Sequence, residues 1–180
     1  MEGFALLIAA TLNAGTILAI AGIGLLINER AGIINLGAEG MMLVAAIAGF
    51  ATAVSTGNDW LAFAAGGVAG ALMAAAFGFL VIWLNTNQVA SGLALSLFGA
   101  GFSAFVGINY VQGKLGDRPQ FSIPGLADIP FIGPALFRQH PMVYLAMLLV
   151  AGVAWFLYRS RAGLVLRAVG ESPESAHALG

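Results

Sequence analysis

Five long stretches of this sequence contain no charged residue, and they constrain the fold more than any other feature. They cover residues 3–27, 40–56, 60–84, 89–112 and 142–158, and all seven Lys and Arg and all eight Asp and Glu residues lie outside them. An uncharged apolar run of about 18 or more residues is typical of a membrane-spanning helix, because a charge at the bilayer centre costs about 2.5–3.5 kcal/mol. The second stretch is short and needs its preceding residues, so the five predicted spans are 3–27, 36–56, 60–84, 89–112 and 142–158.

The composition excludes several classes of protein. Hydrophobic residues make up 60% of the chain and charged residues 8%, whereas soluble domains carry about 25% charged residues. Membrane barrels are excluded as well, because barrel strands alternate apolar and polar residues and these runs are apolar on every face. The net charge of −1 provides no basic surface for nucleic acid. The predicted fold class is therefore all-α: a polytopic helix bundle in the lipid bilayer, with about five transmembrane helices in a single domain.

The sequence lacks the residues that most enzymes and metal sites need. It contains no cysteine, which excludes disulfides, thiolate metal sites and cysteine nucleophiles. Its one lysine, Lys114, is not followed by the Ser or Thr of a phosphate-binding loop, and the spans contain no pair of carboxylates. His140 and His177 fall on opposite sides of the predicted bilayer, so they cannot share a metal ion. We therefore expect no catalytic residue, no metal ligand and no cofactor in this chain.

Arginine residues indicate which side of the membrane each loop faces. Three arginines lie in residues 159–167, directly after the fifth span, and such clusters mark the cytoplasmic end of a span. Residues 159–180 are thus predicted to be cytoplasmic, and alternation of the spans places residues 28–39 and 85–88 inside and residues 113–141 outside. The outer loop contains five prolines and several phenylalanines, so it is either a docking surface for an external partner or a plain connector.

The segment 28–39 has a mixed pattern that fits neither a solvated loop nor a regular helix. Two glycines interrupt it, yet three large aliphatic residues make it too apolar for a loop in water. A broken or re-entrant segment accounts for both features, because irregular backbone survives at membrane depth only where protein or water satisfies it. Glu39 ends this segment, and it either pairs with Arg30 or stabilises a helix N-terminus through the helix dipole.

Few polar side chains lie within or beside the predicted spans, and they are candidates for lining a translocation path. Such groups usually face the interior of a bundle or a wet cavity, because an unpaired polar group in hydrocarbon is costly. In the alternative interpretation, serine and threonine hydroxyls bond to the backbone of their own helix. The candidate path residues are Asn13, Thr16, Asn35, Glu39, Asn87 and Ser91.

Small residues repeat along the third and fourth spans at a spacing of four, which lets membrane helices approach closely. The fourth span has two such rows, and this predicts that it packs on two sides. The rows are Gly66, Gly70, Ala74 and Gly78 in the third span, and Gly92, Ser96, Ala100 and Ala104 beside Gly99, Ser103 and Gly107 in the fourth.

The end of the sequence has the pattern of a helix start. Ser172 suits the N-cap, Pro173 suits the first helical position, and Glu174 suits the positive end of the helix dipole. This pattern predicts a short helix that begins near Pro173. The sequence stops about two turns later, and we expect it to be the N-terminal part of a longer protein.

Three motifs resemble the permease subunits of binding-protein-dependent ABC importers. Residues 161–180 resemble the cytoplasmic coupling segment of these permeases, and Glu-Ser-Ala at 174–176 with Gly180 is similar to their Glu-Ala-Ala-x-x-x-Gly pattern. Residues 29–42 resemble the stretch after an early core helix, and residues 87–95 are closest to the nucleoside or simple-sugar subgroup. The resemblance covers nearly the whole chain, within the branch that includes ribose, nucleoside and branched-chain amino acid permeases.

The resemblance implies a subunit of the cell inner membrane that forms the path for a small polar solute, a nucleoside or a simple sugar, and has no enzymatic activity. It implies three kinds of partner: a second permease subunit, identical or different, ATP-binding cassette ATPase subunits, and an extracytoplasmic solute-binding protein. The residues expected to couple to the ATPase are Gly170, Glu171, Ser172, Pro173, Glu174, Ala176 and Gly180. The alternatives are a stand-alone secondary transporter or channel subunit, and a structural membrane subunit.

Overall fold

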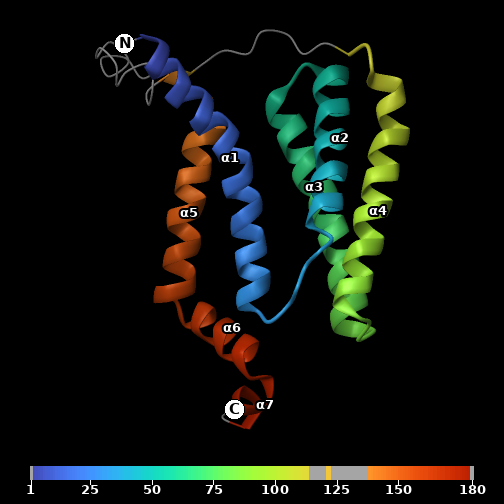
Figure 1. Cartoon of the computed structure of the whole chain (residues 1–180), viewed down its shortest axis with the longest axis vertical. Coiled ribbons are helices and arrows are strands. Elements are labelled where there is room, and N and C mark those ends of the chain that lie inside the picture. Colours follow the sequence, from blue (N-terminus) through green and yellow to red (C-terminus); the bar gives the residue numbers. More distant parts are fainter. Residues whose placement is uncertain (1, 114–120, 123–137, 179–180) are drawn as a thin grey trace. The chain divides into compact units, whose positions relative to one another are not determined.

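The computed structural model describes residues 2–113, 121–122 and 138–178, and these residues are almost entirely helical (Figure 1). The long helices are α1 (Glu2–Arg30), α2 (Ala38–Thr56), α3 (Asp59–Gly78), α4 (Gln88–Gly107) and α5 (Pro141–Arg159). The shorter helices are the π-helix η1 (Phe79–Trp83), the 3-10 helix η2 (Ile108–Tyr110), α6 (Arg161–Glu171) and α7 (Pro173–Ala178). Two short strands, β1 (Phe121–Ser122) and β2 (Arg138–Gln139), pair antiparallel.

Among the residues that the structure describes, five helical stretches are long and apolar enough to cross a membrane. They are Leu7–Arg30, Ala38–Thr56, Asp59–Trp83, Gln88–Tyr110 and Pro141–Arg159. The predicted fold class, a bundle of helices with about five transmembrane helices, is thereby confirmed. Helices suit this environment because their backbone hydrogen bonds are made within the segment, where no water is available. Most of the predicted outer loop 113–141, and Gly180 of the predicted coupling segment, lie outside the described residues.

Asparagine side chains fix where two of the spans begin. The side-chain oxygen of Asn58 accepts hydrogen bonds from two backbone N–H groups of α3, at 2.9 and 3.2 Å, and that of Asn87 accepts one from α4 at 3.0 Å. Each asparagine thereby satisfies donors that a helix N-terminus leaves open. The third span, predicted over residues 60–84, does not end as an α-helix. It continues as η1, after which Asn85 adopts a φ of 48° and turns the chain.

The chain forms two compact units, and the first consists of Met1–Gly32 with Arg118–Gly180. In this unit α1 and α5 lie side by side and run in the same direction (Figure 1). Gln139, just before α5, bonds to Asn13 of α1, and α6 contacts the last residues of α1 at the other end. Alternation of five spans requires this shared direction for the first and the fifth.

The second unit consists of Ile33–Asp117, and in it α2 packs against both α3 and α4. A Cβ added at Gly66 of α3 would lie 2.9 Å from the carbonyl oxygen of Ala45, and one at Gly99 of α4 would lie 2.5 Å from the Cα of Gly40. No larger residue would allow these backbones to approach so closely. The predicted small-residue row thus places Gly66 in a helix contact, whereas Gly78 meets nothing within 4 Å.

The small residues of α4 form one contact face within the second unit. Gly92 and Gly99, which come from the two predicted rows, are both buried, whereas Ala100 and Ala104 are exposed. A separation of seven residues returns to nearly the same side of a helix, since two turns take 7.2 residues. The contact of α4 with α2 therefore uses a single side of α4, and packing on a second side stays a prediction.

Candidate functional site

Residues 33–37, which we call the strap, join α1 to α2 without forming a helix. The side-chain oxygen of Gln88 accepts a hydrogen bond from the backbone N–H of Ile34 at 2.8 Å, and the hydroxyl of Ser96 donates to the carbonyl of Leu36 at 2.8 Å. Gln88 and Ser96 are about 12 Å apart along α4, so the strap runs along the first turns of that helix. The break in the helical chain predicted for this region is confirmed.

The second half of the strap, residues 35–37, is held by an asparagine turn and by close backbone packing. The side-chain oxygen of Asn35 accepts a hydrogen bond from the N–H of Gly37 at 2.9 Å, and its amide nitrogen lies 3.7 Å from the sulfur of Met41. Such a turn replaces a missing backbone bond with a side-chain one. A Cβ at Gly92 would lie 2.9 Å from the Gly37 nitrogen, so the main chains of the strap and α4 touch here.

Four of the six predicted path residues lie in the second unit, near the strap and the helix ends beside it. Asn35 forms the strap turn, and Asn87 caps α4. The hydroxyls of Ser91 and Thr86 are 2.8 Å apart and hydrogen-bonded. Glu39 is exposed in the first turn of α2, where a negative charge is favoured by the helix dipole. Each of these side chains therefore has a local structural role.

The other two predicted path residues lie on α1, in the first unit. The Asn13 amide donates to the carbonyl of Ala9 at 2.9 Å and to the side-chain oxygen of Gln139 at 2.7 Å. Gln139 is only 1% exposed. The hydroxyl of Thr16 donates to the carbonyl of Leu12 at 2.7 Å, which is the own-helix alternative that the sequence leaves open.

Glycines hold α6 at both of its ends. A Cβ at Gly163 would lie 2.8 Å from the Cα of Leu157, near the end of α5, and one at Gly170 would lie 2.8 Å from the nitrogen of Gly32, just after α1. Ser160 caps α6 by accepting a hydrogen bond from the Gly163 N–H at 2.9 Å. The helix α6 therefore joins the end of α5 to the end of α1.

Arg167 makes a second contact across the corner between α5 and α6. Its guanidinium carbon lies 5.1 Å from the centre of the Tyr158 ring, within the range of a cation–π interaction. Its Nε is buried and has no hydrogen-bond partner among the residues that the structure describes. The sequence presents Arg167 only as a marker of the cytoplasmic side, because the pairing depends on the angle at this corner.

The predicted helix start near Pro173 is confirmed. The Ser172 hydroxyl accepts a hydrogen bond from the N–H of Ser175 at 3.3 Å, and its carbonyl accepts one from the N–H of Ala176 at 3.0 Å. Pro173 occupies the first position of α7 and Glu174 lies in its first turn. Of the predicted coupling residues, Gly170 contacts the end of α1 and Glu171 ends α6.

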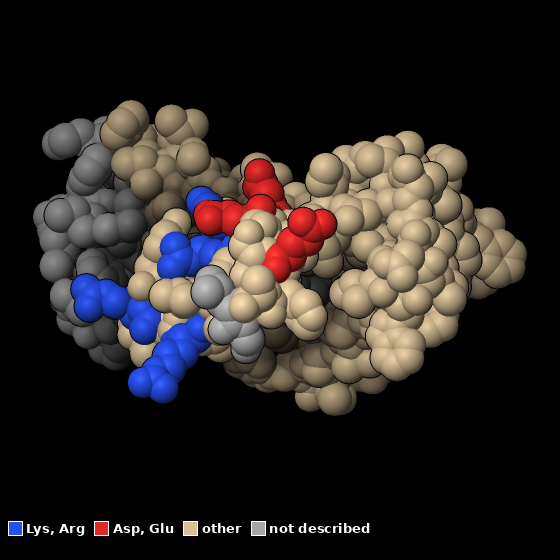
Figure 2. Space-filling view, turned by 90° about the horizontal axis from the view of Figure 1, so that it is seen from below, with Lys and Arg blue, Asp and Glu red and all other residues tan. Residues whose placement is uncertain are grey.

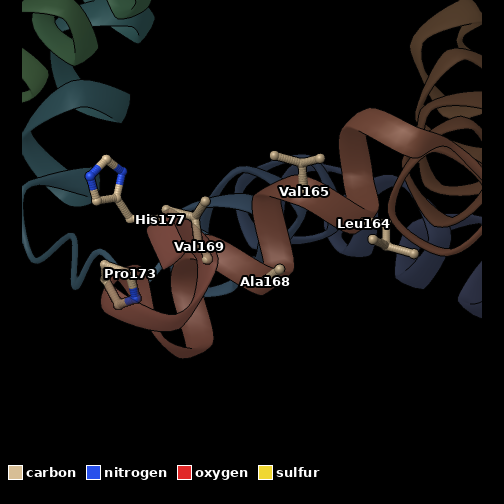
Figure 3. A pocket seen from close by; sticks show the side chains of 7 residues that line it. Leu164, Val165, Ala168, Val169, Pro173 and His177 are labelled. Atoms are coloured by element: carbon tan, nitrogen blue, oxygen red, sulfur yellow. The ribbon is translucent and has the colours of Figure 1, made fainter. Parts of the chain in front are cut away.

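An open apolar groove of about 570 Å³ lies over α6 and α7 (Figure 3). The side chains of Leu164 and Val165 in its wall are 60% and 58% exposed. Seen from this end of the chain, basic side chains gather on one side, with acidic side chains next to them (Figure 2). An exposed apolar groove is typical of a protein interface. The groove is lined by Leu164, Val165, Ala168, Val169, Pro173, Ala176 and His177.

Comparison with known proteins gives a match along nearly the whole chain. Residues 7–180 match the family described as branched-chain amino acid transport system, permease component. A putative glucose ABC transporter permease protein of Haloferax volcanii, TsgC13, is 47% identical over 178 residues, which cover 97% of this chain and 54% of that protein. No solved structure matches the chain.

Two bacterial proteins are also similar. The nucleoside ABC transporter permease protein NupC of Lactococcus lactis is 31% identical, and the guanosine ABC transporter permease protein NupQ of Bacillus subtilis is 29% identical. Both matches cover 97% of this chain and 59% of the relative. The chain therefore spans somewhat more than half the length of these three curated relatives.

Proposed function

This chain belongs to the family of permease components of branched-chain amino acid transport systems, and on that premise we propose that it forms the membrane path of an ABC importer. The observation that carries the proposal is the family match over residues 7–180, which contains all five apolar helices. Family membership and these helices identify a multi-pass membrane protein. ATP hydrolysis belongs to a separate ATPase subunit, and the permease chain has no catalytic residue of its own.

The proposed solute is a small neutral polar molecule, a nucleoside or a simple sugar. The similar proteins are named for glucose, nucleosides and guanosine. Amides and hydroxyls bind such solutes because they both donate and accept hydrogen bonds without adding charge. In the second unit, Asn35, Asn87 and Ser91 supply these groups beside the strap. Asn13 and Thr16 supply them on α1, and Glu39 completes the proposed set of path residues.

The proposed partners are an ATPase subunit, a second permease subunit and an extracytoplasmic solute-binding protein. The groove over α6 and α7 is the proposed ATPase contact, because its apolar wall is exposed and lies in the arginine-rich segment that the sequence assigns to the cytoplasm. The coupling residues proposed for this contact are Gly170, Glu171, Ser172, Pro173, Glu174, Ala176 and Gly180.

The proposed mechanism is a nucleotide-driven exchange between two states of the path. ATP binding draws the ATPase subunits together and pushes α7, and the helix bundle then changes between outward-open and inward-open states. Nucleotide shifts this equilibrium only to the extent that the ATPase binds the two states with different free energies. A short helix that is capped at Ser172 and begins with Pro173 keeps its shape under such a push, because its first turn is already satisfied.

Reconstitution into liposomes tests the proposed function. The transporter, assembled with its ATPase and binding protein, is expected to take up radiolabelled guanosine or glucose only when ATP is present. Co-purification of the ATPase subunit with this permease is the second expected result. Uptake by the permease alone, without ATPase or ATP, would contradict the proposal and would favour the secondary transporter or channel.

A further inference from the structure

We propose that α6 drives the translocation path through its backbone contact at Gly170, which displaces Gly32 and with it the strap. This inference rests on the proposed function and adds the residues that transmit movement from the ATPase side. Its three components are a main-chain contact, a rigid corner and a segment fastened to α4 by two side chains.

The first component is a contact of main chain with main chain. A Cβ at Gly170 would lie 2.8 Å from both the carbonyl carbon of Ala31 and the nitrogen of Gly32. Conversely, a Cβ at Gly32 would lie 2.9 Å from the carbonyl oxygen of Gly170. No side chain separates the two segments, so rotamer changes cannot absorb a displacement of α6. A push on α6 therefore moves the end of α1 directly, as expected of close-packed protein.

The second component is the corner at the other end of α6. Gly163 packs on the backbone of Phe156 and Leu157, and Arg167 stacks over Tyr158 of α5. These contacts hold α6 at a fixed angle to α5. Movement of α6 is therefore passed on at Gly170 instead of being lost by bending at the corner.

The third component is the strap, which begins at the peptide bond after Gly32. Gly32 has a φ of 77°, in the left-handed region where glycine is favoured, and there the chain leaves the helical path of α1. Beyond it, Gln88 and Ser96 fasten the strap to α4 through Ile34 and Leu36. A displacement of Gly32 must pull on these two hydrogen bonds. It thereby reaches Asn35, which is a proposed path residue in the middle of the strap.

A cysteine at Ile34 reports on this movement. The Ile34 side chain is 59% exposed, and the 180 residues contain no other cysteine. In the assembled transporter carrying Ile34→Cys, we expect the rate of maleimide labelling to change by about fivefold or more on addition of ATP and vanadate, a typical allosteric coupling. When Gly170→Ala is added, the labelling rate should no longer change with nucleotide, because the new methyl group forces the two backbones apart.

Gly152→Ala is the matched control, because a Cβ at Gly152 of α5 would meet nothing within 4 Å. It should leave the nucleotide-dependent change intact. A second variant covers the case in which Gly170→Ala does not assemble: insertion of two glycines between Gly32 and Ile33 adds slack and leaves the Gly170 contact unchanged. This insertion should also abolish the change, whereas the same insertion after Gly57, another left-handed glycine between helices, should not.

Uptake by the parent transporter in the same liposomes distinguishes failure of the proposed function from failure of this inference. If ATP-driven uptake is absent in the parent, the proposed function fails and this inference fails with it. If the parent transports with ATP, and labelling still responds to nucleotide after the insertion at Gly32, transmission through the strap is wrong while the proposed function stands.

Discussion

Asn13 and Gln139 form a hydrogen bond between two amides, one on α1 and one at the start of α5. The Gln139 side chain is almost fully buried, so its oxygen cannot exchange Asn13 for water. If the Asn13 amide is removed, the buried Gln139 oxygen loses this hydrogen bond and gains none from water, which costs free energy. In membrane proteins, however, bonds of this kind contribute modestly, because the unfolded chain also finds partners.

We predict a coupling free energy of about 0.6–1.7 kcal/mol between these two amides. A double-mutant cycle of Asn13→Ala and Gln139→Ala, with unfolding followed in detergent, measures it. Thr16→Ala serves as the control, because the Thr16 hydroxyl bonds to its own helix at Leu12, and its cycle with Gln139→Ala should be additive. Additivity of the Asn13 and Gln139 variants would contradict the assigned bond.

Gly99 and Gly101 offer a matched comparison on one helix. A Cβ at Gly99 would lie 2.5 Å from the Cα of Gly40, whereas one at Gly101 would meet nothing within 4 Å. Gly99→Ala should therefore lower the free energy of unfolding by about 1–3 kcal/mol through overpacking. Gly101→Ala should raise it by up to about 1 kcal/mol, because alanine favours a helix. Thermal unfolding of both variants in detergent checks the opposite signs, and equal shifts would show that α2 and α4 do not meet here.

At the scale of elements, α7 depends on its first backbone hydrogen bonds. It has six residues, and the N–H of Ala176 donates to the carbonyl of Ser172. Ala176→Pro removes this bond at a cost of about 3 kcal/mol, more than so short a helix can supply. We predict that this variant inserts into the membrane and loses ATP-driven uptake, as measured in liposomes with the ATPase present.

Arg161→Pro is the control for the α7 variant. Arg161 is the first residue of α6, and Ser160 before it already has extended backbone angles, with φ −92° and ψ 151°. Proline is tolerated at such a position because no intrahelical N–H bond is lost. Uptake should therefore persist in Arg161→Pro. Full uptake by Ala176→Pro would show that a helical α7 is not needed for coupling.

The elements that the sequence predicts are those set by local chemistry. The spans are predictable from uncharged runs, which can be recognised without knowing any tertiary contact. The start of α7 is predictable from Ser172 and Pro173. The π-helix Phe79–Trp83 lies in an apolar run without any break in pattern, so its extra residue per turn leaves no mark in the composition. It ends where Thr86 bonds through its backbone and hydroxyl to the carbonyl of Leu80, a contact that only the folded turn creates.

The candidate site is likewise only partly predictable from the sequence. A broken segment is predictable from glycines within apolar residues, and Asn35 is predictable as a polar residue within it. Gln88 and Ser96, which fasten the strap, are 54 and 60 residues away in sequence from the groups they bind. Gln88 resembles an ordinary residue beside a helix cap, and Ser96 resembles a packing residue in a small-residue row. Their partners become visible only when α4 is placed beside the strap.

At the scale of the whole molecule, the shared direction of α1 and α5 constrains the membrane topology. Both helices end at α6, so residues 28–32 and the start of α6 belong to the same side of the membrane. The arginines at 159–167 predict that this side faces the cytoplasm. The connection between α2 and α3 then falls on the opposite side, because one span separates it from α1.

Single cysteines test this arrangement in a sequence that has none of its own. Ala162→Cys in α6 and Ser55→Cys at the end of α2 replace exposed residues. In intact cells with a permeable outer envelope, a membrane-impermeant maleimide should label Ser55→Cys and should label Ala162→Cys only after the membrane is disrupted. The reason is energetic: moving the adjacent arginines across the bilayer costs about 2.5 kcal/mol or more for each charge. Labelling of Ala162→Cys from outside would invert the topology, and α6 could not then meet an ATPase in the cytoplasm.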